Sequence, residues 1–159
     1  MPLPPSPSPG SSSHAQDTPK PPATARWLGL AGLLPFIACG GVAVLGPAQW
    51  QAASAAALAA YAAVIVSFLG GIHWGLAMRQ LPQSSTALLG WGVMPSLLAW
   101  PALWLPHAAA LGVLGASLLL CFAVDRRLYP AQGLAGWLPL RAQLTAVASL
   151  SCWLTATTL

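Results

Sequence analysis

Charge is what this sequence has least of. Lys, Arg, Asp and Glu together make up 5% of the 159 residues, and there is no glutamate at all. An ordinary soluble domain carries roughly 25% charged residues, so the composition excludes a soluble globular protein. The six Lys and Arg residues are scattered along the chain, without the basic patch that nucleic-acid binding needs. We therefore expect no nucleic-acid partner.

Motifs for catalysis and for ligand binding are also missing. The chain has no GxSxG, no HExxH and no glycine-rich phosphate loop, and Asp17 and Asp125 are its only carboxylate side chains. Acid–base catalysis would therefore have few groups to use. Three cysteines lie in apolar runs without CxxC spacing, which predicts small buried residues rather than disulfides or metal ligands; they are Cys39, Cys121 and Cys152. We predict no enzyme activity, no cofactor and no metal site.

Long apolar runs are what the sequence has instead. Hydrophobic residues make up 57% of the chain, and its mean hydropathy is +0.69. A helix needs roughly 20 apolar residues to cross the hydrocarbon core of a bilayer. Five runs come close to that length or exceed it; they cover residues 27–45, 50–78, 86–105, 108–124 and 144–159.

These runs predict an all-α polytopic membrane protein, a bundle of five transmembrane helices. The five-span domain covers residues 26–159 and follows a disordered tail at 1–25, which is rich in Pro and Ser and has no apolar pattern. The run at 50–78 would be about 43 Å long as a helix, so we expect it to tilt or to begin in the headgroup layer. Pro35 in the first span, and Pro95 and Pro101 in the third, predict interrupted helices.

The cations indicate the orientation of the chain. Lys and Arg occur before the first span, between the second and third, and between the fourth and fifth; they are Lys20, Arg26, Arg79, Arg126, Arg127 and Arg141. With five spans these three places lie on one side of the membrane. The positive-inside rule then predicts a cytoplasmic N-terminus and a C-terminus outside.

The second apolar run also carries small residues at every fourth position. Ala59, Ala63, Ser67, Gly71 and Gly75 follow this spacing, which brings them onto one face of a helix that another helix can approach closely. We predict that Gly71 and Gly75 contact another helix of the same chain.

His73 lies between these two glycines and six residues before Arg79, which is about 9 Å along a helix. An ionisable group inside a membrane is a functional candidate because its burial is costly. One interpretation is that neutral His73 holds the bundle together by bonding to a hydroxyl of the last span or to a carbonyl opened by Pro35 or Pro95. The other is that His73 lies near a transport path.

Asp125 follows the fourth span and precedes Arg126 and Arg127. We expect it at the membrane surface in an exposed ion pair with Arg79 or Arg141, worth about 0 to 1 kcal/mol. On this interpretation no carboxylate lies within the membrane to exchange a proton with His73.

The stretch YAAVIVSFLGGIHWGLAM, together with LGLAGLLPF before it and Asp125 and LRAQLT after it, resembles the domain of unknown function 3429 family of small multi-pass proteins of bacterial inner membranes. The resemblance covers residues 27–159. It implies the fold and a location in the cell inner membrane, and it supplies no activity. The motif and the charged helix ends give our candidate functional or helix-packing residues: Ser67, Gly70, Gly71, His73, Trp74, Gly75, Arg79, Asp125 and Arg141.

The sequence thus favours an integral membrane protein without catalytic activity. Its helix faces would serve packing, assembly or interaction within the lipid bilayer, with a membrane-protein partner or with further copies of itself. The alternative is a small transporter or channel subunit with His73 near the path, because broken helices often line substrate paths.

Overall fold

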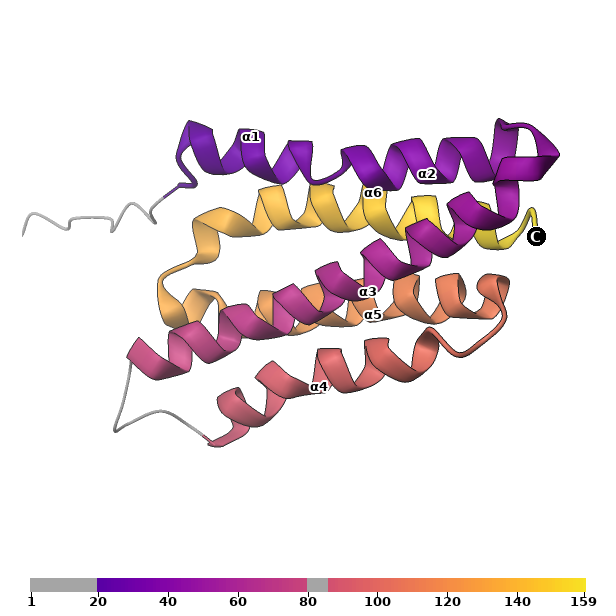
Figure 1. Ribbon diagram of the computed structural model, residues 1–159. Helices are drawn as coiled ribbons and strands as arrows, with labels where there is room; N and C mark the ends of the chain where they lie inside the picture. The colour runs from indigo at the N-terminus through magenta and orange to yellow at the C-terminus, as the bar shows by residue number, and fades with distance from the viewer. Residues whose placement is uncertain (1–19, 80–85) are drawn as a thin grey trace, which may run out of the picture.

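The computed structural model describes residues 20–79 and 86–159, and in these ranges it contains helices and no strand. The first apolar run forms α1 (Ala23–Ala31) and α2 (Leu34–Leu45), which lie nearly end to end (Figure 1). Then follow α3 (Ala48–Arg79), α4 (Thr86–Ala102), α5 (His107–Leu128) and α6 (Leu138–Ala156). Two short 3₁₀ helices, η1 (Pro130–Gln132) and η2 (Ala135–Trp137), connect α5 to α6. The predicted all-α bundle is confirmed.

The boundary of the predicted tail is wrong at its last residues. α1 begins at Ala23, directly after Pro22, because alanine and arginine at positions 23, 25 and 26 are good helix formers. The rest of the predicted tail, 1–19, and most of the polar loop after Arg79, 80–85, lie outside the described residues.

Among the described residues, three helical segments are long and apolar enough to cross a membrane: Ala23–Leu45, Ala48–Arg79 and His107–Leu128. α4 and α6, with 17 and 19 residues, are packed alongside them. That these two helices also cross the membrane stays a prediction.

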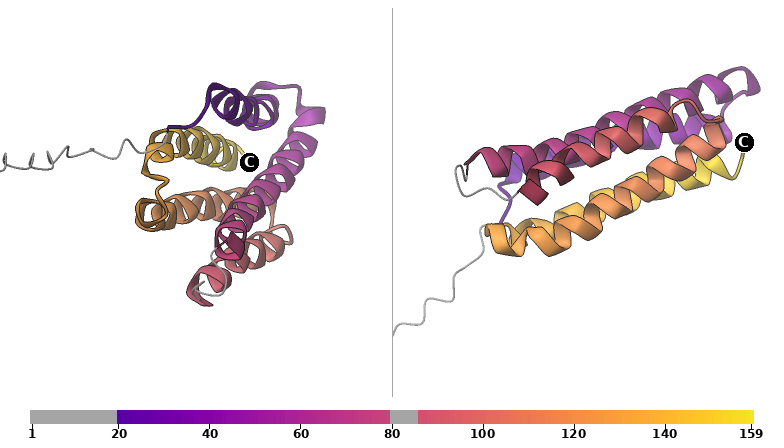
Figure 2. Two further views of the ribbon diagram at one scale, coloured as in Figure 1. Left: turned by 90° about the vertical axis from the view of Figure 1, so that its left-hand side faces the viewer. Right: turned by 90° about the horizontal axis from the view of Figure 1, so that it is seen from below.

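The longest helix, α3, is the centre of the bundle. Its 32 residues extend over about 48 Å, and it runs diagonally across the other helices (Figure 1). It contacts α2, α4, α5 and α6. Viewed along the bundle, α4 lies on one side and the α1–α2 span on the other, with α3, α5 and α6 between them (Figure 2, left).

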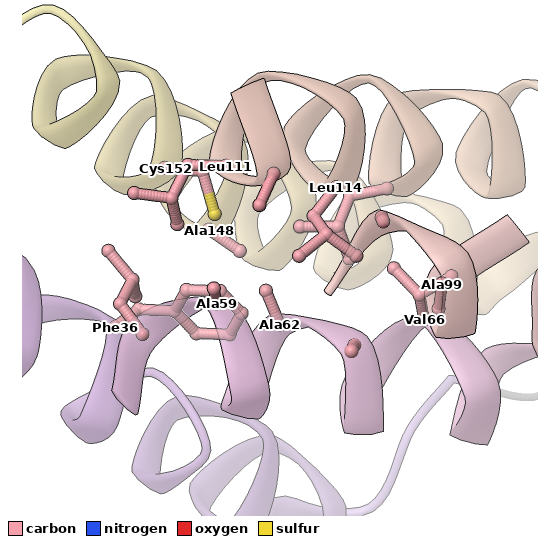
Figure 3. Close-up of a cluster of buried hydrophobic side chains, with 14 of the residues drawn as sticks. Phe36, Ala59, Ala62, Val66, Ala99, Leu111, Leu114, Ala148 and Cys152 are labelled. Carbon is pink, nitrogen blue, oxygen red and sulfur yellow. The ribbon is translucent and has the colours of Figure 1, made fainter. Parts of the chain in front are cut away.

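The core is built largely from small side chains on α3 that lie against larger ones from its neighbours. Ala59, Ala62 and Val66 of α3 face Leu111 and Leu114 of α5 (Figure 3). Small residues let helix backbones approach closely, which is the main source of helix association in lipid. Cys121 and Cys152 are buried free thiols, as predicted, and Cys39 is half-buried.

Proline acts differently in the first and third spans. Between α1 and α2 the helix breaks just before Pro35, and the Tyr61 hydroxyl donates to the Gly32 carbonyl over 2.9 Å. α4 instead continues through both Pro95 and Pro101, so the interruption predicted there is wrong. Pro95 is accommodated because its ring packs against the backbone of Gly70, where no side chain intervenes.

Candidate functional site

Three ionisable side chains from three helices meet inside the bundle. His73 comes from α3, Asp125 from the last turn of α5 and Arg141 from the first turn of α6. His73 and Asp125 are each 1% exposed, and Arg141 is 9% exposed. We call these three residues the buried cluster.

Asp125 is the centre of the cluster because each of its two oxygens faces a different helix. Oδ2 accepts hydrogen bonds from Nε of Arg141 at 2.9 Å and from its Nη2. Oδ1 lies 3.3 Å from Nε2 of His73. The predicted pairing of Asp125 with Arg141 is confirmed, but the prediction that the pair is exposed is wrong. Arg79, the other predicted partner, is exposed at the end of α3.

The predicted bonding partners of His73 are also wrong. Its Nδ1 lies 3.3 Å from the carbonyl oxygen of Leu69, one turn earlier on α3, and its Nε2 faces Asp125. The expectation that no carboxylate reaches His73 fails because α3 crosses α5 at an angle. His73, six positions before the end of α3, thereby meets Asp125, three positions before the end of α5.

Both ring nitrogens of His73 thus face oxygen acceptors. A neutral imidazole has a proton on only one nitrogen, so either neutral tautomer directs a lone pair at an oxygen. Nε2 of His73 and Oδ1 of Asp125 lie close together, but no hydrogen bond joins them. His73 therefore brings a polar ring of α3 next to the carboxylate of α5.

Two further residues border the buried cluster. Tyr129 is 3% exposed, and its ring centre lies 6.2 Å from that of His73. Burial, and then the charge of Asp125, raise the pKa of Tyr129 above its ordinary value of 10, so its phenol is protonated and can donate. Thr145 is 3% exposed, and its hydroxyl has no hydrogen-bond partner among residues 20–79 and 86–159.

Sequence reasoning missed both Tyr129 and Thr145, although a signal was present. Tyr129 follows Asp125 by four positions, and Thr145 follows Arg141 by four, so each continues the helical face of a charged residue.

Gly70 faces the neighbouring helix α4, whereas Gly71 and Gly75 face away from the rest of the bundle. A side chain on Gly70 would collide with the Gly92 carbonyl of α4, and its Cβ would lie 3.2 Å from the Pro95 ring. Gly71 and Gly75 have open space around them, so the prediction that they contact another helix of this chain is wrong. The physical reason is that a four-residue step turns about 40° too far on a helix of 3.6 residues per turn. The small residues at every fourth position are accordingly buried at Ala59 and Ala63, half-buried at Ser67 and exposed at Gly71.

Trp74 connects α3 to α4. Its indole N–H donates to the Leu89 carbonyl over 3.0 Å, and its ring covers Gly92, three positions further along α4. The same arrangement recurs between α6 and α5. There Trp153 donates to the Gly112 carbonyl over 3.2 Å, and its ring covers Gly115. Two helix pairs are thus joined by a tryptophan that lies on a glycine.

Among the described residues, no three His, Cys, Asp or Glu side chains are grouped so that they could hold a metal ion. The buried cluster contributes one carboxylate, one imidazole and one guanidinium. It can bind oxygen-bearing groups through the guanidinium, and it joins three helices.

Comparison with known families agrees with this fold. The model of a family described as "Protein of unknown function (DUF3429)" matches residues 21–157. The chain belongs to this family. Family membership confirms the resemblance seen in the sequence, and the family's description contains no activity.

A curated relative is Transmembrane protein 69 of Xenopus tropicalis, 38% identical over 146 residues. The match covers 86% of this chain and 53% of the relative, so the chain spans about half the length of the curated relative it matches. No solved structure matches the chain. Together with its apolar helices, the family and this relative identify the chain as a membrane protein.

Proposed function

We propose that this protein is a non-catalytic assembly protein of the inner membrane that pairs with a second copy of itself. The contact surface is the outer face of α3, made by Ser67, Gly71 and Gly75. The buried cluster serves this function by fixing α3 against α5 and α6, so that the face is presented on a rigid bundle.

The observation that carries the proposal is the open space around Gly71 and Gly75. Glycine inside a helix costs about 1 kcal/mol relative to alanine. At Gly70 the close approach of α4 offsets this cost, whereas nothing in the described part of the chain does so at Gly71 and Gly75. Two glycines four positions apart on a lipid-facing helix allow two backbones to pack together. A second copy would supply the missing contact.

Gly41 on α2 provides a matched control. It too has open space around it, but Ile37 and Leu45 occupy the positions four residues before and after it. It therefore belongs to no small-residue pair.

The test is energy transfer between donor-labelled and acceptor-labelled copies in liposomes, over a range of protein-to-lipid ratios. We expect the unchanged protein and Gly41→Leu to associate equally, and Gly71→Leu/Gly75→Leu to need at least about tenfold more protein, since packing worth 1.4 kcal/mol is a factor of ten. Equal association of all three proteins would refute the glycine contact. If the unchanged protein stays monomeric, the assignment of a second copy fails.

A second candidate function, a proton-coupled transporter or channel subunit, is favoured by the two oxygen atoms that face the nitrogens of His73. Against it, the large cavity of the bundle is lined by Leu69 and Ile72 and not by His73. Proton flux into proteoliposomes separates the candidates. His73→Gln keeps one donor and one acceptor but does not titrate. A flux that this variant abolishes in a folded protein would establish the second candidate.

We also propose the orientation predicted from the cations. The beginning of α1, the ends of α3 and α5 and the beginning of α6 lie at the same end of the bundle (Figure 1), which supports placing all six Lys and Arg on one side. With the N-terminus in the cytoplasm, Leu159 lies outside. A reporter enzyme fused after Leu159 should therefore show activity outside the cytoplasm and none inside it. Cytoplasmic activity of that fusion would reverse the assignment.

A further inference from the structure

A cavity of about 520 Å³ lies between the α1–α2 span, α3 and α6. Its walls are almost entirely apolar, with Gly29, Leu33, Ile65, Ile72 and Leu144 among the lining residues. Leu28 and Phe68 also line it and are 69% and 64% exposed. The cavity therefore opens sideways, towards the lipid, between α1 and α3. Its volume is in the range of small-molecule sites, roughly 300 to 1,000 Å³.

Polar groups are confined to one region of the cavity wall. Arg141 of the buried cluster lines it there, together with Thr145 and Tyr129. Thr145 is 97% buried, and no described residue offers its hydroxyl a hydrogen-bond partner. A buried hydroxyl without a partner is unfavourable, so this side chain indicates an acceptor that a ligand would supply.

The other two groups are also donors. A guanidinium has five N–H groups, and Asp125 accepts two of those of Arg141. Tyr129 lines the same region, and its phenol is protonated for the reason given above. Donors from α6 and from the residue that follows α5 therefore lie at one end of an apolar cavity.

We propose that this cavity binds a lipid acyl chain that ends in an oxygen-rich acidic head group. The chain occupies the apolar part between α1 and α3, and its head-group oxygens accept hydrogen bonds from Thr145 and Arg141. The shared chemistry is that of a free fatty acid and of one chain of an acidic phospholipid. Lipid binding at this cavity does not rest on the self-association proposed above.

Thr155 offers a matched control for Thr145. Both hydroxyls are on α6, both residues are at least 97% buried, and neither hydroxyl has a hydrogen-bond partner in the part of the chain that the structure describes. Of the two, only Thr145 lines the cavity. Thr145→Val and Thr155→Val remove the same group with little change of shape. A third variant, Ile72→Trp, fills the cavity from α3 with a larger side chain.

The experiment is a titration of the purified full-length protein with palmitate, phosphatidylglycerol or hexadecane, followed by native mass spectrometry. We expect palmitate or phosphatidylglycerol to bind, and whichever binds more tightly identifies the source of the acyl chain. Thr145→Val should weaken binding about three- to tenfold, the factor that one hydrogen bond contributes. Thr155→Val should leave binding unchanged, and Ile72→Trp should reduce it at least tenfold while the thermal melting temperature shows a folded protein.

Three results would overturn the proposal. Equal binding of hexadecane would show that the head group is not recognised. Equal effects of Thr145→Val and Thr155→Val would remove the role of the cavity hydroxyl. Undiminished binding to folded Ile72→Trp would place the lipid elsewhere on the protein.

Discussion

The two tryptophan–glycine junctions of the bundle look alike but are supported differently. At the α3–α4 junction, Trp74 covers Gly92, and further contact comes from the backbones of Gly70 and Gly92 and from the Pro95 ring. At the α5–α6 junction, Trp153 covers Gly115, and two polar contacts are added. Ser149 donates to the Gly115 carbonyl over 3.1 Å, and Asp125 accepts from Arg141.

The difference shows two ways of holding helices together where hydrophobic burial contributes little. In lipid the association of helices depends on close packing and on hydrogen bonds between them. The α3–α4 junction depends mostly on packing and the α5–α6 junction mostly on polar contacts. Substitutions that introduce a larger side chain should therefore destabilise the α3–α4 junction most. Substitutions that remove a polar partner should destabilise the α5–α6 junction most.

The largest expected effect is at Asp125. Asp125→Ala removes the carboxylate from the buried cluster and leaves Arg141 buried without its partner, which should lower the free energy of unfolding by about 3 to 5 kcal/mol. Unfolding by denaturant in detergent micelles measures it. Asp125→Asn, which keeps the shape and one acceptor, should cost less. A fully stable Asp125→Ala protein would show that the polar contacts of α5–α6 are dispensable.

A smaller loss is expected from Gly70→Leu at the α3–α4 junction. The new side chain would meet the Gly92 backbone and the Pro95 ring, and overpacking of this kind costs about 1 to 3 kcal/mol. The adjacent Gly71→Leu is the control, since its side chain would enter open space. In micelles that contain monomers this variant should lose no stability and should gain up to about 1 kcal/mol, because leucine is a better helix former than glycine. Equal losses in both variants would contradict the direction assigned to each glycine.

The smallest effects are expected from the indole groups. Trp74→Phe and Trp153→Phe each remove one N–H donor and keep a ring over the glycine, which should cost about 0.6 kcal/mol and at most about 1.7. Ser149→Ala should add to the loss in Trp153→Phe, because both groups bond to the same stretch of α5. If Trp74→Phe proves the more damaging by several kcal/mol, the α3–α4 junction depends on hydrogen bonding after all.

The sequence predicted the helices well because apolar runs act locally, whereas the effect of Pro95 depends on the neighbouring Gly70 of α3. In the last span, Ser151 bonds back to the Val147 carbonyl, and Ser149 crosses to α5. The directions of side chains were predicted less well. A four-residue repeat suggests one face, but over the four steps from Ala59 to Gly75 it turns by about 160°, which moves the two glycines from the core to the surface.

The buried cluster could be predicted only in part. The pairing of Asp125 with Arg141 follows from their positions at facing ends of consecutive spans. The contact of His73 with Asp125 depends on the angle at which α3 crosses α5, and no local pattern contains that angle. The depth of burial was missed for the same reason, since Asp125 appeared to belong to the charged end formed with Arg126 and Arg127.

The break before Pro35 has a consequence for the local stability of the chain. α1 has no buried residue, whereas α2 beyond the break contributes Phe36, Gly40 and Ala43 to the interior. Because Tyr61 holds the Gly32 carbonyl at the break itself, α1 can separate from α6 while α2 stays in place. Amide hydrogens of α1 should therefore exchange with solvent at a lower free energy of opening than those of any other helix. The separation of α1 from α6 would then let a molecule dissolved in the bilayer enter the bundle while the other helices stay folded.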